Sequence, residues 1–366
     1  MKYRTLPRTG DRIGILGLGA NGVAVNGDPE EARLTYEMAI ENGINLFDLA
    51  GSNDLPFKAL GEAMKGKRDQ VFVQAHFGAD YTHGEYGWTM DLDTIRKSLA
   101  HQLESLQTDY IDYGFIHCLD QPEEFEKALN EGLADLVKDW QQTGRVRHIG
   151  LSTHNPAIAH KTMDLGLVDL IMFSINPVYD YTDQGDYSLG QASERMEMYQ
   201  RAAREGVGIS VMKPFSGGQL LDAKRSPFGF ALTTWQCIQY ALDKPGVLAT
   251  LPGIGDREQM KDYLAFLEAP DEERDYSMLA SVAPAEQSGV CVYCNHCAPC
   301  PAGINIGMVN KFYDLALIGD PMAAEHYAAL EKHAGDCLHC GHCDKRCPFQ
   351  VHQSGRMDEI RDYFKQ

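Results

Sequence analysis

A short apolar run, an amphipathic stretch and a glycine recur in that order along the first 268 residues. The glycines that end the amphipathic stretches are placed where a left-handed helix C-cap is favoured: Gly43, Gly66, Gly144, Gly206 and Gly246. An apolar run of β type follows each of them. With three further runs, eight strands are predicted: Ile13–Leu18, Ile44–Phe47, Val71–Gln74, Tyr110–Ile116, Val146–Leu151, Leu170–Ile175, Val207–Val211 and Val247–Leu251.

Helices are predicted between these strands, at Asp28–Asn42, Asp91–Gln107, Pro122–Gln142 and Ala192–Glu205 among others. The first begins with an Asp28 N-cap, Pro29 at N1 and an acidic Glu31 at N3. Strands that are almost wholly apolar and alternate with helices indicate a parallel sheet covered on both faces. Eight such units in about 250 residues match a (β/α)8 barrel, the TIM-barrel arrangement.

A dinucleotide-binding fingerprint is the competing interpretation of the N-terminal glycines. The segment Gly17-Leu18-Gly19-Ala20-Asn21-Gly22 satisfies GxGxxG after a strand. That motif needs a helix opening at the glycines so that the helix N-terminus meets the pyrophosphate. Here Val23–Gly27 intervenes, and the predicted helix begins only at Asp28. We therefore interpret the glycines as a flexible loop at the barrel mouth.

Eight of the ten cysteines fall in two short runs near the C-terminus, each closed by proline. The runs are Cys291-x2-Cys294-x2-Cys297-x2-Cys300-Pro301 and Cys337-x2-Cys340-x2-Cys343-x3-Cys347-Pro348. A terminal Cys-Pro after closely spaced cysteines is the bacterial ferredoxin pattern for [4Fe–4S] ligation. Zinc sites of four cysteines use two separated CxxC pairs instead. A disulfide framework fits poorly, because the chain is long and we recognise no signal peptide.

In two-cluster ferredoxins the fourth cysteine of each run binds the other cluster. On that pattern one cluster is held by Cys291, Cys294, Cys297 and Cys347, and the other by Cys337, Cys340, Cys343 and Cys300. The last gap of the first run is one residue shorter than the usual motif, so the exchange is less certain there. The two remaining cysteines, Cys118 and Cys237, are interpreted as small buried core residues.

The 366 residues have room for one large domain and a small one. We predict a barrel over residues 1–268, an acidic linker over 269–289 and an iron–sulfur domain over 290–366. Between the cysteine runs, Ile304–Leu330 is predicted to form two short helices broken at Gly319-Asp320-Pro321. The small domain is therefore expected to be helical and ferredoxin-like.

Charge and hydropathy exclude two classes of partner. The formal charge of −19, from 33 basic and 52 acidic residues, argues against nucleic acid and anionic membrane. No apolar run approaches the ~18–20 residues that span a bilayer. Oxygen-sensitive clusters and free thiols favour a reducing, cytoplasmic location.

Active sites of barrels lie at the C-terminal ends of the strands. Polar residues follow or end the predicted strands at Asp48, His76, His117, Ser152, His154, Asn155, Asn176 and Lys213. Imidazoles titrate near neutrality and serve as general acids and bases. Any one of them is more often a hydrogen-bonded structural residue, but Asp48, His76 and His117 on three consecutive strand ends favour a catalytic group. No HxH or HExxH pattern indicates a metal site in the barrel.

The chain resembles the aldo-keto reductase superfamily, in its branch with a C-terminal ferredoxin-type domain. The resemblance is carried by Asn45–Ala50, Tyr110–Asp112 leading to His117, Val146–Ser152, Lys213–Gly218 and Leu251–Gly253. It implies carbonyl reduction with a nicotinamide at the barrel mouth, by an aspartate, a tyrosine proton donor, a lysine and a histidine. Asp48 and His117 match the aspartate and the histidine, whereas Asn53 stands for the tyrosine and His76 for the lysine. An asparagine amide does not titrate, so the usual proton donor is missing.

The resemblance also implies cofactor contacts. Ser152 and Asn176, with Gly217 and Gly253, match positions that line the nicotinamide site. Where the family often has an arginine for the 2′-phosphate of NADPH, this chain has Ile254-Gly255-Asp256, followed by Arg257. A carboxylate there repels a phosphate. NADPH is thus the weaker candidate, and NADH or no nicotinamide stays open; no flavin motif is legible, but a flavin is not excluded.

The leading hypothesis is an oxidoreductase in which electrons pass between two [4Fe–4S] clusters and a site at the barrel mouth, with an external electron donor as a candidate partner. His76 and His117 would transfer the proton and Asp48 would orient one of them. Two alternatives stay open. One is a non-redox lyase or isomerase with structural clusters, and the other is an electron-transfer or binding partner. His76, His117, His148, His154 and Lys213 make the mouth locally basic, which favours a small anionic or polyoxygenated substrate.

Overall fold

The computed structural model describes residues 1–182, 189–282, 289–320 and 322–365. The described chain divides into two compact units. The first comprises Met1–Ile175, Gly206–Pro214 and Leu248–Ala269, and the second Asn176–Glu205, Phe215–Val247 and Pro270–Gln366. The boundaries predicted from the sequence, at 1–268, 269–289 and 290–366, remain predictions that this division into two units does not test.

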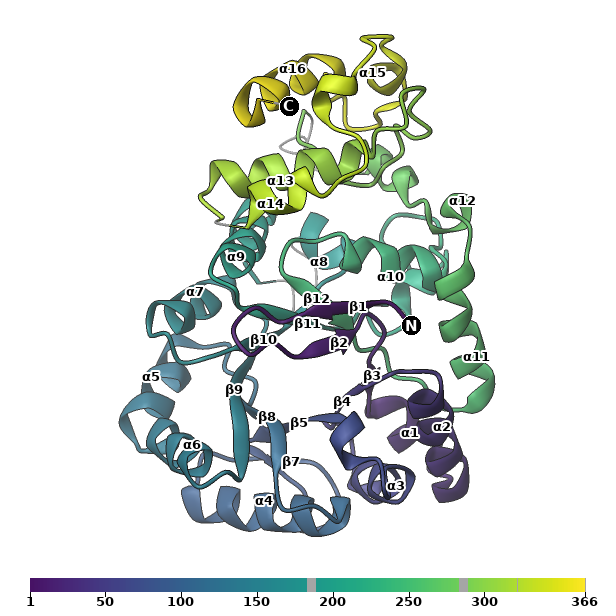
Figure 1. The fold of residues 1–366 in the computed structure, drawn as a ribbon. Helices are drawn as coiled ribbons and strands as arrows, with labels where there is room; N and C mark the ends of the chain where they lie inside the picture. Colours follow the sequence, from purple (N-terminus) through teal and green to yellow (C-terminus); the bar gives the residue numbers. More distant parts are fainter. Residues whose placement is uncertain (183–188, 283–288, 321, 366) are drawn as a thin grey trace. The chain divides into compact units, whose positions relative to one another are not determined.

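An eight-stranded parallel sheet forms the centre of the first unit (Figure 1). Its strands are, in sheet order, β3 (Leu18–Gly19), β4 (Leu46–Asp48), β5 (Phe72–Phe77), β8 (Ile111–Ile116), β9 (Val146–Thr153), β10 (Leu170–Ser174), β11 (Gly208–Met212) and β12 (Val247–Thr250). Parallel bridges join Leu16 to Thr250 and Gly19 to Gly253. These bridges connect the first strand to the last, so the sheet closes and the predicted (β/α)8 barrel is confirmed.

Helices of the first unit lie outside the strands in Figure 1. They are α1 (Asn21–Asn26), α2 (Pro29–Glu41), α3 (Leu55–Ala63), α4 (Leu92–Leu106), α5 (Pro122–Asn130), α6 (Leu133–Gln142), α7 (Pro156–Asp164) and α11 (Arg257–Ala265). The Asp28 cap is confirmed, because its Oδ1 accepts hydrogen bonds from the backbone N–H groups of Glu30 (2.9 Å) and Glu31 (3.1 Å). The five predicted C-cap glycines all have positive φ, between 69° and 84°.

A cluster of buried apolar side chains joins strands β4, β8, β10, β11 and β12 to the Leu6–Ile13 segment and to Leu251. Its members are Leu6, Ile13, Leu46, Tyr113, Phe115, Leu170, Met172, Met212, Leu248, Ala249 and Leu251. Each large side chain buried in this way contributes about 1.5–3 kcal/mol. The short hairpin of β1 (Tyr3–Thr5) and β2 (Arg12–Gly14) precedes the first barrel strand.

Two predictions about the N-terminal glycines were wrong. A helix does open at the motif, since α1 begins at Asn21. The glycines are also packed rather than flexible: a Cβ on Gly19 would lie 2.8 Å from the Leu251 carbonyl oxygen, and one on Gly22 would lie 2.4 Å from the Ile254 backbone. Close approach of two backbone segments is what requires glycine here.

The second unit is helical, as far as it is described. Its helices are α8 (Pro177–Tyr181), α9 (Ala192–Arg204), α10 (Thr234–Leu242), α12 (Asp271–Arg274), α13 (Ile306–Leu317), α14 (Ala323–Ala328), α15 (His342–Arg346) and α16 (Gln353–Phe364). The two helices predicted between the cysteine runs match α13 and α14, while Pro321 in their predicted break lies outside the described residues. The predicted linker contains α12 and a 3₁₀ turn at Ser277–Ser281, and its residues 283–288 lie outside the described chain.

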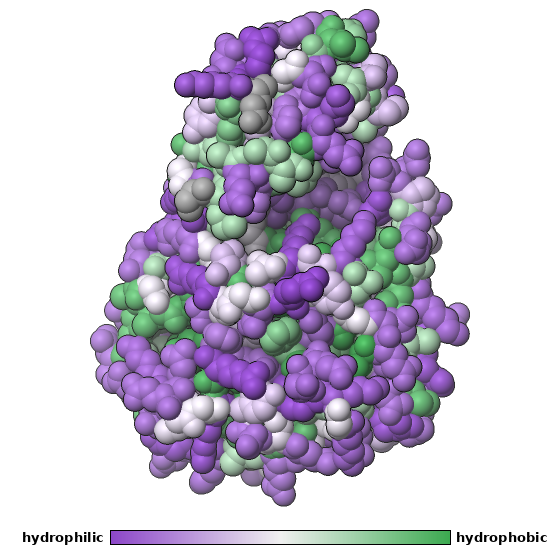
Figure 2. Space-filling model, in the orientation of Figure 1, coloured by the Kyte–Doolittle hydropathy of each residue, from purple (hydrophilic) through white to green (hydrophobic). Residues whose placement is uncertain are grey.

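Two further findings concern membranes and the surface. No helix among the described residues is long and apolar enough to cross a membrane. On the face drawn in Figure 2, hydrophilic residues cover most of the surface and apolar residues are scattered among them.

Candidate active site and cysteine cavities

Three side chains at the C-terminal ends of β4, β5 and β8, with a tyrosine just before β7 (Gly87–Trp88), form one hydrogen-bonded series. His76 Nε2 lies 2.7 Å from Asp48 Oδ1, and His76 Nδ1 lies 3.0 Å from His117 Nδ1. His117 Nε2 lies 2.9 Å from the Tyr86 hydroxyl. We call Asp48, His76, His117 and Tyr86 the Asp48 relay. The structure therefore brings the predicted Asp48, His76 and His117 together, and it adds Tyr86, which the sequence analysis missed.

The deep end of the Asp48 relay is fixed by polar contacts inside the barrel. Gln74 Nε2 donates to Asp48 Oδ1 at 2.9 Å, and Ser210 Oγ donates to Gln74 Oε1 at 3.2 Å. The strand register explains this arrangement, since Asp48 on β4 pairs with Gln74 on β5. Buried polar groups that are fully hydrogen-bonded hold one geometry. The Asp48 carboxylate is thus held in place by Gln74 and by His76.

Burial sets the charge state of His117. Its pKa lies well below the ordinary 6.5, because burial disfavours the imidazolium and the neighbouring His76 and His154 add to this effect. His117 is therefore neutral near pH 7 and carries one ring N–H. A neutral imidazole has one donor nitrogen and one acceptor nitrogen, so the hydrogen bonds on its two sides are coupled.

This pKa shift predicts how stability depends on pH. Below pH 6.5 the unfolded chain binds a proton at His117 that the native chain does not, so native stability falls as the pH drops. The loss is at most about 1.4 kcal/mol per pH unit for one such group. We expect the thermal midpoint to fall between pH 7.5 and 5.5, and to fall less steeply for His117→Asn. Equal slopes for the two proteins would contradict the assignment.

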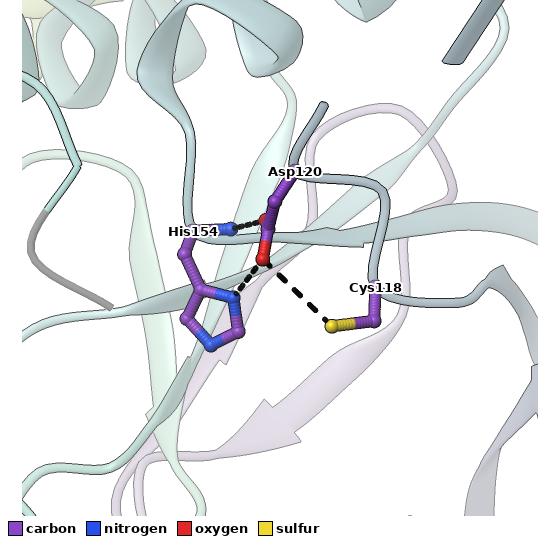
Figure 3. Close-up of side chains that lie close together, drawn as sticks. All are labelled: Cys118, Asp120 and His154. Carbon is purple, nitrogen blue, oxygen red and sulfur yellow. Dashed lines mark hydrogen bonds and ion pairs between the residues drawn. The ribbon is translucent and has the colours of Figure 1, made fainter. Parts of the chain in front are cut away.

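A second polar group lies at the ends of β8, β9 and β11, and Figure 3 shows its members Cys118, Asp120 and His154. The Asp120 carboxylate accepts the backbone N–H of His154 at 2.6 Å and faces His154 Nδ1 at 2.8 Å. His154 Nε2 lies 3.3 Å from Lys213 Nζ. Burial raises the pKa of Asp120 and the contacts with His154 lower it, with a net pKa below the ordinary value. The carboxylate is therefore charged and holds His154 with Nδ1 as donor.

Cys118, Asp120 and His154 place three possible metal ligands within 4.8 Å of one another. These groups are already engaged, because Asp120 Oδ1 also accepts from Thr153 Oγ1 at 3.0 Å and the Lys213 amine stands beside His154. A cation would have to displace these contacts and would face that amine. We therefore interpret the group as a hydrogen-bonded network. Cys118, predicted to be buried, is only half-buried here, whereas Cys237 is buried as predicted.

Backbone strain marks the same edge of the barrel. Cys118 and Lys213 have φ values of 51° and 55°, in the left-handed region that costs side-chain-bearing residues about 1–3 kcal/mol. Lys213 Nζ is directed to the His154 contact, and burial lowers the Lys213 pKa. Strained residues of this kind concentrate at functional sites.

Of the other residues predicted for the barrel site, Asn53, Asn176 and Gly253 have structural contacts. The Asn53 amide donates to the Ala24 carbonyl at 3.0 Å and accepts the Leu55 N–H at 3.1 Å. Ser152 is buried in β9. Asn176 caps α8 by accepting the Tyr179 N–H at 3.1 Å. Gly217 has a φ of 64° with open space where a Cβ would stand, and Gly253 packs against the Gly22 backbone.

Two basic residues, His148 and Arg257, are paired with carboxylates. His148 does not belong to the mouth, because it lies near the start of β9, 3.6 Å from Asp11 and 3.3 Å from Asp169. Its inclusion in a basic mouth was therefore wrong. Arg257, which follows Asp256 where the resemblance implies an arginine for the 2′-phosphate of NADPH, is held by Glu31 through bonds of 3.0 and 2.9 Å.

In the second unit the cysteines line two cavities. One is lined by Cys291, Cys294, Cys297 and Cys347. The other is lined by Cys297, Cys300, Cys337, Cys340 and Cys343. Apolar residues complete both linings, among them Val292 and Phe349 in the first and Ile304 and Met357 in the second. The last cysteine of each run thus lies with the other run.

Known proteins of similar sequence and structure agree on one family. The profile of the Aldo/keto reductase family matches residues 15–236, more than half of the chain. The uncharacterized oxidoreductase YrpG of Bacillus subtilis is 28% identical over 60% of this chain and 68% of its own length. L-Galactose dehydrogenase of Arabidopsis thaliana is 26% identical over 61% of this chain and 68% of its own. The chain spans only about half (47%) of a third relative, aldo-keto reductase YhdN of Bacillus subtilis.

A solved structure supports the fold. The holo form of an aldo-keto reductase from Bacillus halodurans superposes with a TM-score of 0.63 at 21% identity. The match covers 78% of this chain and 97% of that one. At this identity the likeness bears on the barrel fold alone. The profile match over more than half of the chain shows that the chain belongs to the aldo/keto reductase family and is an oxidoreductase.

Proposed function

We propose that the chain is an iron–sulfur oxidoreductase of the aldo/keto reductase type. In this proposal two [4Fe–4S] clusters are held by the C-terminal cysteines, and the barrel mouth binds a small-molecule substrate. The observation that carries the proposal is the crossed lining of the two cavities, in which Cys347 joins the first run and Cys300 joins the second. Exchange of the fourth cysteine is the pattern of two-cluster ferredoxins.

The spacing of the sulfurs favours clusters over single zinc ions. A tetrahedral zinc with Zn–S bonds of about 2.3 Å holds its sulfurs only ~3.8 Å apart. Among the described residues, no three of the C-terminal cysteine sulfurs lie within 4.8 Å of one another. A cuboidal cluster suits wider spacing, because each thiolate binds a different iron atom.

Hydrogen-bond donors around the cysteines also suit clusters. The Val351 N–H lies 3.3 Å from Cys347 Sγ, and the His339 N–H lies 3.4 Å from Cys337 Sγ. Gln353 Nε2 lies 3.6 Å from Cys291 Sγ and is buried. Hydrogen bonds to the sulfurs tune the potential of a bound cluster. Clusters bound here would supply one-electron carriers.

The proton chemistry is assigned to the first unit. Asp48 fixes His76, His76 contacts His117, and these two imidazoles hold and transfer a proton at the barrel mouth. Asn53 occupies a structural position and contributes no proton. Lys213, held by His154, would place a cation near an anionic or polyoxygenated substrate.

A nicotinamide is proposed as the two-electron partner, since family membership implies one. Ser152, Asn176, Gly217 and Gly253 are its proposed contacts. Because Glu31 already engages the Arg257 guanidinium, NADH is favoured over NADPH. L-Galactose and pyridoxal are suitable probe substrates, because two relatives are named L-galactose dehydrogenase and pyridoxal reductase.

The test is the metal content of protein purified without oxygen. We expect about eight irons and as many acid-labile sulfides per chain, and an electron paramagnetic resonance signal of reduced clusters after dithionite. Zinc without labile sulfide would overturn the proposal.

A further inference from the structure

The Asp48 relay runs from the barrel interior to the surface. Asp48 and His76 are 2% and 1% exposed, His117 is 9% exposed and Tyr86 is 43% exposed. Tyr86 is therefore the most exposed member of the Asp48 relay. Its ring is held edge-on to the His117 ring, with centroids 5.8 Å apart.

Backbone pairing fixes Tyr86 beside the loop where the family places its tyrosine. Tyr86 precedes the hairpin strand β7 (Gly87–Trp88), which pairs with β6 (Ala79–Asp80). The Tyr86 N–H donates to the Ser52 carbonyl at 3.0 Å, and Asn53 forms an antiparallel bridge with Glu85. Asn53, which has no titratable group, is thus paired with Glu85, the residue next to Tyr86.

The hydrogen bonds of the Asp48 relay have a defined direction. A carboxylate accepts only, so His76 Nε2 donates to Asp48. With both imidazoles neutral, His76 Nδ1 must accept, His117 Nδ1 must donate, and His117 Nε2 is left to accept from the Tyr86 hydroxyl. One extra proton on His76 reverses the outer bonds, because His76 Nδ1 then donates and His117 Nε2–H points to Tyr86.

The geometry points to Tyr86 as the residue that exchanges the proton with substrate, in place of the tyrosine absent at position 53. This inference rests on the proposed function. In reduction, the carbonyl carbon receives a hydride from a nicotinamide-class donor and the carbonyl oxygen takes the Tyr86 proton. Starting from the relay with the extra proton on His76, Tyr86 then takes the proton from His117 Nε2 and His117 Nδ1 takes the proton from His76 Nδ1, which leaves both imidazoles neutral. In alcohol oxidation the same proton moves inward, and the C–H bond gives its hydride to the oxidised nicotinamide.

The test is Tyr86→Phe, which keeps the ring and removes the hydroxyl. Since general acid–base catalysis contributes about 10²–10⁴-fold, we expect kcat for pyridoxal reduction or L-galactose oxidation to fall by at least about 10². We expect KM to change little and the pH dependence of kcat to flatten. Trp88→Phe, in the same hairpin and 46% exposed, is the matched control and should keep kcat near wild type.

A second readout does not depend on turnover. In protein with 15N-labelled histidine, the His117 Nε2 resonance should shift in Tyr86→Phe, because the nitrogen loses its donor, and should not shift in Trp88→Phe. An unchanged resonance, or a kcat within twofold of wild type, would overturn the inference. Both readouts concern the barrel alone. If the iron analysis finds no iron and sulfide, the cluster proposal is overturned, and the Tyr86 inference is still decided by these two readouts.

Discussion

Replacing Cys347 with alanine is expected to remove about half of the bound iron, and to remove it from the cluster held by the first cysteine run. Cys347 belongs to the second run in sequence, but it lines the cavity of Cys291, Cys294 and Cys297. A [4Fe–4S] cluster depends on all four thiolates. The variant should therefore keep about four irons, which an iron and sulfide analysis measures directly.

Two double variants decide between crossed and uncrossed ligation. If Cys291 and Cys347 hold the same cluster, the variant with both replaced by alanine loses only that cluster and keeps about four irons. The variant with Cys291 and Cys300 replaced then loses both clusters. If each run holds its own cluster, the two outcomes are exchanged. Cys118→Ala, which lies outside both cavities, is the control and should keep the full iron content.

Asp48→Asn is expected to lower kcat by about 10²–10⁴-fold. The change is nearly isosteric, but an amide both donates and accepts, so it no longer forces His76 Nε2 to be the donor. The order of hydrogen bonds through His76 and His117 is then lost. Steady-state kinetics with pyridoxal and NADH measures the effect.

The control for this variant is Asp54→Asn, in the loop that follows β4. Asp54 pairs with Lys58 at 2.7 Å and with His101 at 3.2 Å, and it has no contact with the Asp48 relay among its described interactions. It should leave kcat near wild type. The visible absorption and its bleaching by dithionite should be unchanged in both variants. Turnover of Asp48→Asn within a few-fold of wild type would contradict the assigned role.

The fold was largely predictable because the helices between the strands begin and end at capping residues, which can be recognised in the sequence. Glycine C-caps and the Asp28 N-cap act within one turn of helix, so their signal is in the sequence. Two elements were mispredicted. The helix predicted over Pro122–Gln142 is two helices, α5 and α6, because Gly132 takes a φ of 93° between them. The first strand, predicted over Ile13–Leu18, is divided between β2 and β3.

The candidate site was predictable only in part. Asp48, His76 and His117 follow from the rule that strand ends meet at the barrel mouth. Tyr86 does not, because its place depends on pairing between the Tyr81–Tyr86 segment and the Ser52–Asp54 loop, and a bridge of that kind leaves no local periodicity. Asp120 was also missed, although it follows β8 by four residues and could have been considered with the other polar residues there. His148 was misplaced because it lies at the opposite end of its strand.

The measurement that tests the central claim most directly is an absorbance titration of anaerobic protein with NADH, then NADPH, then dithionite. We predict broad visible absorption that NADH bleaches, with NADPH less effective, because electrons then pass from a nicotinamide site to the clusters. Visible absorption that only dithionite bleaches would contradict the nicotinamide site. The absence of visible absorption in iron-replete protein would contradict the clusters themselves.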